Sequence, residues 1–151
     1  MNWPPPDQPV TEVSLFLRSG MIESRLPMEK QWTVEFHEEF AAEVRELPSS
    51  VREKLKAAAI ILSQDGPQLG RPYVDTLNGS RHARMKELRF DADGGAWRIA
   101  IAFDPDRKAV LLVGGDKAGT GQKRFYRDLI RIADERYDRH LQILRSKKET
   151  E

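Results

Sequence analysis

Residues 96–113, AWRIAIAFDPDRKAVLLV, decide the fold that this sequence predicts. Two apolar runs, 96–103 and 109–113, flank a turn-forming Asp-Pro-Asp-Arg segment at 104–107. Side chains alternate between the two faces of a strand, so the aromatic and isoleucine side chains of the first run share one face. Arg98 lies on the other face among alanines, which leave room around it. The segment predicts an antiparallel hairpin with an arginine on its open face.

The sequence upstream of this hairpin predicts one more strand of the same sheet, a pair of helices and a first strand. The strand at 83–90 is separated from the hairpin by the turn sequence DADGG at 91–95. Alternation of apolar and polar residues at 32–36 predicts another strand. Apolar residues at helical spacing then predict helices over 36–47 and 51–62.

A long amphipathic helix is expected after the strands, from Gln122 to Leu144. Earlier in the chain, Ser50 and Glu53 have the spacing of a capping box at the start of the second helix, and Gly66 marks its end. The predicted order is strand, two helices, three antiparallel strands and a C-terminal helix. This order is an α+β fold.

The chain length of 151 residues suits one domain. The first residues are rich in proline, and the strong periodic patterns begin only near Lys30. We therefore expect residues 1–27 to be an N-terminal extension, either disordered or the product of a start codon assigned too far upstream. Residues 28–145 are expected to form the domain, and 146–151 a frayed tail.

Several functional classes are disfavoured by composition. The sequence has no cysteine, which excludes disulfides, thiolate zinc sites and cysteine nucleophiles. The longest apolar run, at 57–62, is far shorter than the roughly 20 residues of a membrane span, and the N-terminus lacks the pattern of a signal peptide. We expect a cytoplasmic protein that has no membrane contact, no metal site and no small-molecule cofactor.

Positive charge is concentrated in one segment of a nearly neutral chain. Residues 81–126 carry 10 Lys and Arg against 6 Asp and Glu, whereas residues 1–80 carry 8 against 12. This pattern favours contact with a polyanion or an acidic partner, although a mixed surface would give the same counts. Strand alternation places Arg84 and Lys86 on one face and Arg89 on the other, so the cations cannot all line one surface.

The start of the last helix also carries an unusual charge pattern. Lys123, Arg124 and Arg127 lie in its first turns, where the helix dipole already supplies positive charge. An anionic ligand such as an RNA phosphate would offset this repulsion. The alternative is an ion pair between Arg124 and Asp128, four residues apart.

Five short motifs carry a resemblance to a known family, namely Met85-Lys86-Glu87-Leu88-Arg89, Trp97-Arg98-Ile99-Ala100-Ile101-Ala102-Phe103, Leu111-Leu112-Val113-Gly114-Gly115-Asp116-Lys117, Phe125-Tyr126 and Ala133-Asp134. With these motifs, the chain over residues 30–145 resembles the RelE/ParE toxin superfamily, and within it the phage-derived, HigB-like branch. The resemblance implies the toxin of a type II toxin–antitoxin pair. It further implies a ribosome-dependent endonuclease that cuts mRNA without a metal, by attack of a ribose 2′-hydroxyl on the neighbouring phosphate.

The same resemblance suggests roles for individual residues. Lys117 is the first choice for stabilising charge or acting as base, with Lys86 second, and Arg98 and Tyr126 complete the catalytic candidates. The RNA-binding candidates are Arg89, Lys123, Arg124, His82 and Arg84. Two alternatives remain open at this point: an ion pair of Arg89 with Glu87, and a packing role for Tyr126.

Partners follow from the resemblance as well: a helix-turn-helix antitoxin, the ribosome and mRNA. Two other activities fit the same family. One is a ParE-like inhibitor of DNA gyrase that acts by protein contact, and the other is an inactive module that binds the antitoxin and assists repression.

Overall fold

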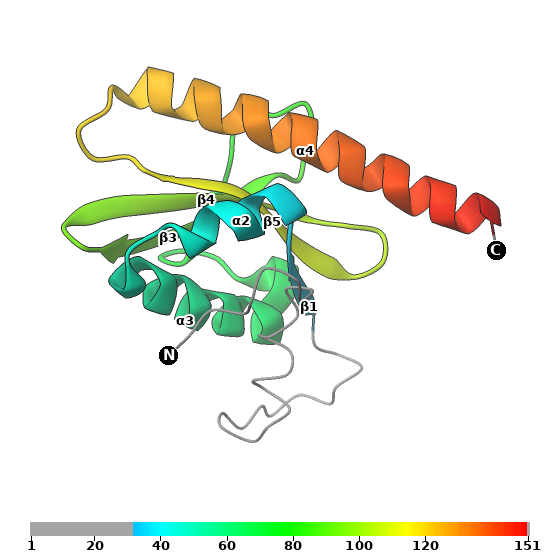
Figure 1. The fold of residues 1–151 in the computed structure, drawn as a ribbon, viewed down its shortest axis with the longest axis horizontal. Coiled ribbons are helices and arrows are strands. Elements are labelled where there is room, and N and C mark those ends of the chain that lie inside the picture. Colours follow the sequence, from blue (N-terminus) through cyan, green and yellow to red (C-terminus); the bar gives the residue numbers. More distant parts are fainter. Residues whose placement is uncertain (1–31, 151) are drawn as a thin grey trace.

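The structure, a computed structural model, describes residues 32–150. A five-stranded sheet lies between α4 on one side and α2 and α3 on the other (Figure 1). The elements in chain order are β1 (Thr33–Phe36), α2 (Glu38–Arg45), α3 (Ser49–Asp65), the 3-10 turn η2 (Gly66–Gln68), β2 (Val74–Thr76), β3 (Lys86–Ala92), β4 (Gly95–Phe103), β5 (Lys108–Asp116) and α4 (Gln122–Thr150). The predicted extension at 1–27 lies outside the described residues.

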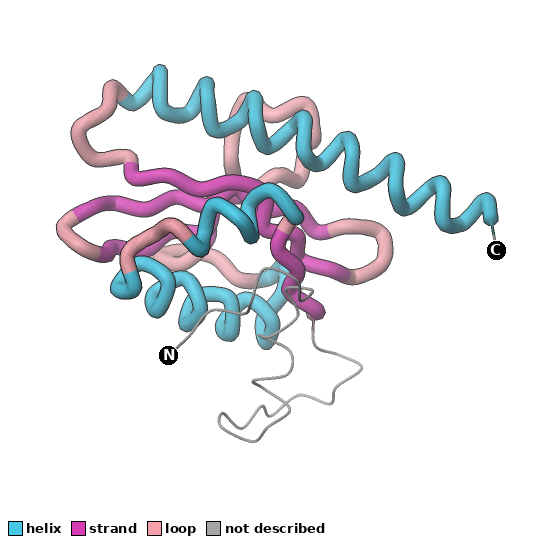
Figure 2. The backbone as a smooth tube through the Cα atoms, in the orientation of Figure 1, coloured by secondary structure: helices cyan, strands magenta, loops and turns pink. Residues whose placement is uncertain are grey.

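The strand order in the sheet is β1-β5-β4-β3-β2. The three predicted strands form the antiparallel meander β3-β4-β5, which confirms the predicted hairpin and the α+β class. Two pairings were not predicted: β1 runs parallel to β5, and the three-residue strand β2 adds to the edge of β3. The turn between β3 and β4 and the loop between β5 and α4 lie at the same end of the sheet (Figure 2).

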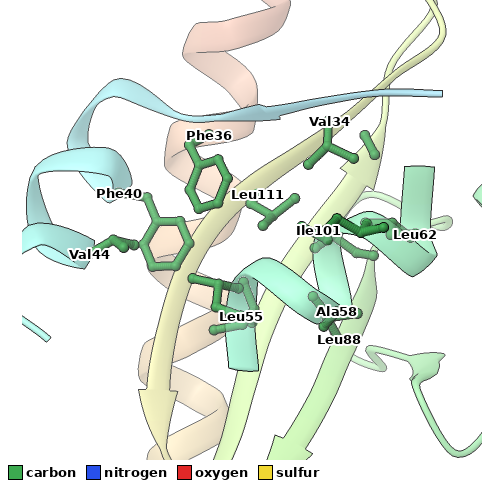
Figure 3. Packing of buried hydrophobic residues seen from close by; sticks show 14 of the residues in the cluster. Val34, Phe36, Phe40, Val44, Leu55, Ala58, Leu62, Leu88, Ile101 and Leu111 are labelled. Carbon is green, nitrogen blue, oxygen red and sulfur yellow. The ribbon is translucent and has the colours of Figure 1, made fainter. Parts of the chain in front are cut away.

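Each face of the sheet packs against its own helices. Ile99 and Ile101 of β4 pack with α2 and α3, whose side chains fill the larger core (Figure 3). Ala100 and Ala102 face α4 instead. The predicted division of β4 into a bulky and a small face is therefore confirmed, and the small face is the one that receives the final helix.

Helix ends differ from the sequence prediction at two places. The prediction of a capping box at Ser50 is wrong, because α3 begins at Ser49, two residues earlier than predicted, and Pro48 occupies the N-cap position without a side-chain cap. Gly66 does end α3, with a φ of 61° that suits glycine. Helix α4 begins at Gln122 as predicted but continues past the expected end at Leu144 to Thr150.

A β-bulge interrupts the pairing of β4 with β5. Ala100 pairs with Val113 and Ile101 pairs with Leu111, so Leu112 is an extra residue on β5. As a consequence Leu112 and Val113 both lie in the core beneath α4. The bulge leaves the Leu112 carbonyl outside the regular ladder between these two strands.

Arg136 of α4 donates a hydrogen bond to the Leu112 carbonyl. Its Nη1 donates to the Leu112 oxygen at 2.7 Å and to Glu43 Oε1 at 2.9 Å, and its Nη2 donates to Glu43 Oε2 at 2.6 Å. Glu39 lies 3.3 Å from its Nε and also pairs with Arg139. Because Glu39 and Glu43 belong to α2, one buried guanidinium joins α4, the bulge and α2.

The two glycines after the bulge let side chains approach β5 from both faces. A Cβ on Gly114 would lie 2.4 Å from Ile99 Cδ1, and a Cβ on Gly115 would lie 3.0 Å from Phe125 Cε1. Gly114 thus makes room on the face of α2 and α3, and Gly115 makes room for the first turn of α4. These glycines therefore allow close packing on both faces of β5.

Replacing Arg136 by Met should lower the free energy of unfolding by about 2 kcal/mol, because the Leu112 carbonyl loses its donor. Chemical denaturation monitored by circular dichroism measures the change. Arg139→Met is the matched control, since Arg139 is half exposed and Glu39 is its only ion-pair partner within residues 32–150; it should cost less than about 1 kcal/mol. Equal losses in the two variants would contradict a special role for the buried guanidinium.

Candidate functional site

Four charged residues of β2, β3 and β4 lie on the face of the sheet that α4 covers. Arg89 pairs in register with Arg98, and Asp75 pairs with Glu87. Like charges directly opposite one another are unfavourable unless other groups offset them. Here the offset is diagonal: Arg98 Nε lies 3.6 Å from Glu87 Oε1, and Arg89 Nη1 lies 3.7 Å from Asp75 Oδ2. The alternative in which Arg89 pairs with Glu87 is therefore wrong, because Arg89 pairs with Asp75 instead.

Tyr126, in the second turn of α4, completes a cluster with Glu87 and Arg98. Its hydroxyl donates a hydrogen bond of 2.7 Å to Glu87 Oε1, the same oxygen that faces Arg98. The Tyr126 ring packs against Phe125 at the edge of the core under α4. The alanines of β4 leave the space that this arrangement needs. The Glu87 carboxylate therefore links Arg98 of β4 to Tyr126 of α4.

Burial and the Glu87 carboxylate together control the ionisation of Tyr126. Burial raises the pKa of Tyr126 above its usual range, and the hydrogen bond and negative charge of Glu87 raise it further, while Arg98 opposes them. The net result is a phenol that keeps its proton at neutral pH and points that proton at a carboxylate. Such a group can donate a proton when another acceptor takes the place of Glu87.

Arg98 has donor capacity that the protein leaves unused. Its side chain is 8% exposed, its Nη1 donates to the Trp97 carbonyl at 2.9 Å, and its Nε is buried with no hydrogen-bond partner among the described residues. The Nε atoms of Arg45 and Arg136 are also unbonded, but Arg136 makes three short hydrogen bonds through its terminal nitrogens. The Nε of Arg98 thus faces Glu87 at 3.6 Å without a hydrogen bond, and a buried donor that is only partly satisfied is costly.

A cavity of about 620 Å³ reaches this arginine. Its wall combines residues of α3, the segment before β2, and the ends of β3 and β4 that lie near their shared turn. The lining residues are Lys54, Ala57, Ala58, Ile61, Arg71, Pro72, Tyr73, Arg89, Phe90, Asp91 and Arg98. Arg98 is therefore one of four cationic residues that line the cavity, with Lys54, Arg71 and Arg89.

Lys86 is separated from this cluster. It pairs with Ile101, a residue of the core on the other face, and its Nζ donates to the Pro67 carbonyl at 3.0 Å. The predicted placement of Lys86 and Arg89 on opposite faces is confirmed. Because of it, the structure does not bring Lys86 together with Arg98 and Tyr126.

Of the remaining cations near the start of α4, Lys117 is half-buried, and Lys123 and Arg124 are exposed. Lys117 follows β5 at the same end of the sheet, two residues after Gly115, the register partner of Arg98. Lys123 and Arg124 lie in the first turn of α4 and form no ion pair with a described residue. The predicted pairing of Arg124 with Asp128 is not observed; Arg127 approaches that carboxylate instead, at 3.9 Å.

His82 and Arg84 belong to the connection between β2 and β3. His82 Nε2 lies 2.8 Å from Asp138 Oδ1, its ring packs edge-on against Tyr137, and Arg81 pairs with the same Asp138. These contacts tie the connection to the middle of α4. Arg84 is exposed and forms no ion pair within residues 32–150. His82 thus has a structural partner, and Arg84 remains free on the surface.

Sequence analysis missed the carboxylate at the centre of the site and the cations on its far wall. Glu87 was considered only as a partner for Arg89, whereas it holds both Arg98 and Tyr126. Lys54 and Arg71 were not considered, because they lie outside the basic segment at 81–126. No three His, Asp or Glu side chains within residues 32–150 form a group suited to a metal ion. No helix of that part of the chain is long and apolar enough to cross a membrane.

Replacing Glu87 by Gln should lower the pKa of Tyr126, because the variant removes the negative charge that opposes ionisation while Arg98 stays in place. Absorbance near 295 nm against pH measures tyrosinate formation, and subtraction of the same titration of Tyr126→Phe isolates this residue. The midpoint should move toward lower pH in Glu87→Gln. An unchanged midpoint would show that Glu87 does not control the phenol.

Comparison with known proteins gives consistent matches. The family described as phage-derived protein Gp49-like (DUF891) matches residues 42–138. Over 111 residues the chain is 42% identical to a protein of Mycobacterium tuberculosis named "putative toxin HigB2", covering 73% of this chain and 54% of HigB2. Over 81 residues it is 52% identical to "putative toxin HigB3" of the same organism, covering 54% of this chain and 68% of HigB3.

The chain thus spans about half the length of HigB2. Among solved structures, a mutant of the E. coli toxin RelE in the free state matches with a TM-score of 0.49 and 17% identity, covering 70% of this chain and 97% of the RelE chain. The family match includes α3, β2 to β5 and the first half of α4, the elements that build the site. The chain therefore belongs to the phage-derived Gp49-like family, and its identity to two proteins named HigB agrees with the HigB-like branch that its strand and loop motifs predicted.

Proposed function

We propose that this chain is the toxin of a type II toxin–antitoxin pair and that it inhibits translation by cutting mRNA on the ribosome. The observation that carries the proposal is its identity of 42% and 52% to two proteins named as toxins of the HigB type. The same family relationship supports a cognate helix-turn-helix antitoxin as its partner. The proposed localisation is the cytoplasm, where ribosomes and mRNA are available.

The chemistry of the proposed reaction requires three groups. A ribose 2′-hydroxyl attacks the adjacent phosphorus while a base takes its proton, a cation stabilises the charge of the pentacovalent phosphorane, and an acid protonates the leaving 5′-oxygen. Arg98 suits the second role, because its guanidinium is permanently charged and the residue lines the cavity. Planar guanidinium groups match phosphate oxygens in geometry.

Tyr126 suits the role of acid. Its raised pKa keeps the phenol protonated at neutral pH, and its proton already lies in a hydrogen bond to a carboxylate. Glu87 is a positioning residue in the free protein, because it holds both Tyr126 and Arg98. A substrate phosphate would compete with Glu87 for both groups, and the displaced carboxylate is then available to accept the 2′-hydroxyl proton.

The cations around this cluster suit the RNA backbone. Arg89 lies beside Arg98 on the same face, and Lys117, Lys123 and Arg124 follow at the same end of the sheet. Lys117 remains the candidate for additional charge at the reacting phosphate. Lys86 is left out of the proposed mechanism, because its Nζ binds the Pro67 carbonyl on the other face.

Replacing Tyr126 by Phe should reduce mRNA cleavage by about 10²-fold or more, since a positioned acid contributes on that scale. The packing of the ring is preserved. Arg98→Lys should also reduce cleavage, because lysine keeps the charge but not the planar geometry. Cleavage is measured by primer extension on transcripts in a translation reaction. Arg145→Lys is the matched control, because Arg145 is exposed on the distal part of α4 and should leave cleavage unchanged.

Each outcome of this experiment has a clear meaning. Cuts that follow codon phase and require translation support the proposal. Growth arrest with intact transcripts and a DNA-damage response would instead indicate a gyrase inhibitor that acts by protein contact. Antitoxin binding with neither effect would indicate a corepressor that has lost activity. Full cleavage by a folded Tyr126→Phe variant would refute the role given to the phenol.

A further inference from the structure

The proposed reaction uses one end of the cavity and leaves the opposite wall without a role. That wall consists of Lys54 and the small or branched side chains of α3 on one side, and of the segment Arg71-Pro72-Tyr73 on the other. The segment precedes β2 and continues along the edge of β3, since Tyr73 accepts a backbone hydrogen bond of 2.8 Å from Arg89. The wall is therefore fixed to the same strand that carries Glu87 and Arg89.

Charge along the cavity is mostly positive. Four of its lining side chains are cationic, namely Lys54, Arg71, Arg89 and Arg98, and Asp91 is the one carboxylate among them. Asp75 partly neutralises two of these cations: it pairs with Arg71 at 2.6 Å and with Arg89 at 3.7 Å, without lining the cavity itself. Lys54 forms no ion pair with any residue that the structure describes.

Tyr73 adds an aromatic surface to this wall. It is 43% exposed, although it lines a cavity whose other wall is apolar, with Ala57 and Ile61 contributed by α3. Its backbone is held by hydrogen bonds to Gly70 and Arg89. A large aromatic side chain that is exposed beside cations, on a backbone fixed by hydrogen bonds, suits stacking on a planar ligand.

We propose that this part of the cavity binds one unpaired nucleotide of the RNA, next to the phosphate held at Arg98. The base stacks on Tyr73 against the apolar wall of α3, and the phosphate of that nucleotide contacts Lys54 and Arg71. The inference rests on the function proposed above and adds a subsite to it. It assigns a role to α3 and to the segment before β2, neither of which contributes to the Glu87–Arg98–Tyr126 cluster.

The size and chemistry of the cavity favour a nucleotide over an acidic peptide. A volume of about 620 Å³ falls within the range of pockets that enclose small ligands. Recognition of single-stranded RNA typically combines an aromatic platform with cations that follow the backbone. An acidic peptide would use the cations but would have no need of the exposed ring.

The test is binding of a fluorescein-labelled 2′-O-methyl RNA hexanucleotide, which lacks the reacting hydroxyl, measured by fluorescence anisotropy at low salt. Tyr73→Ala should weaken binding at least about fivefold, the lower limit for loss of one stacked base. Tyr73→Phe should restore it. Lys54→Gln should reduce the slope of log affinity against log salt by about 0.7, the value for one phosphate contact on a single strand. Ile143→Ala, at the other exposed large apolar residue of the described chain, is the control and should bind as the wild type does.

The results separate this inference from the proposed function. Unchanged binding by Tyr73→Ala, or no binding by the wild type, overturns the subsite even where the wild type cuts transcripts. Conversely, Tyr73-dependent binding by a protein that cuts no transcript supports the subsite and contradicts the nuclease. If a synthetic Glu-rich peptide binds in a Tyr73-dependent manner and the RNA does not, the cavity is a docking site for protein and the proposal is overturned. Circular dichroism of each variant checks that the fold is retained.

Discussion

The arrangement of this domain depends on the hydrogen bonds that the Arg136 guanidinium makes. A bulge in β5 frees the Leu112 carbonyl from the ladder, and Arg136 binds that carbonyl together with Glu43 of α2. Backbone groups left unpaired in a core are costly, so the bulge and the arginine require one another. The same contact connects helices from opposite faces of the sheet, which no strand pairing could do.

This contact also determines where the site forms. Tyr126 lies ten residues before Arg136 on one continuous helix, a distance of about 15 Å along its axis. Fixing Arg136 over the bulge therefore fixes the first turns of α4 over Gly115 and Glu87. The absence of a Cβ at Gly115 permits that approach, because Phe125 occupies the space. The cluster of Glu87, Arg98 and Tyr126 thus depends on a contact that lies well away from it.

Local patterns in the sequence predicted the meander, the two faces of β4 and the start of α4, because these depend on side-chain periodicity and on turn residues. The same alternation correctly separated Lys86 from Arg89. Alternation could not predict contacts between distant segments, such as the pairing of β1 with β5 or the ion pair of Arg136 with Glu43, 93 residues earlier. The candidate site was the part least predictable from local patterns. Glu87 has its role because it binds Tyr126, 39 residues away, and Lys54 has its role because it lines the cavity.

The unbonded Nε of Arg98 has a consequence for the lifetime of the free protein. This enclosed Nε lies 3.6 Å from Glu87 Oε1, beyond hydrogen-bond distance, and a buried donor that is only partly satisfied lowers the stability of the empty domain. Binding to the native state alone raises the melting temperature with ligand concentration. Occupancy of the cavity and resistance to thermal unfolding are therefore coupled, and a protease that acts on the unfolded chain would remove the empty form faster than the occupied one.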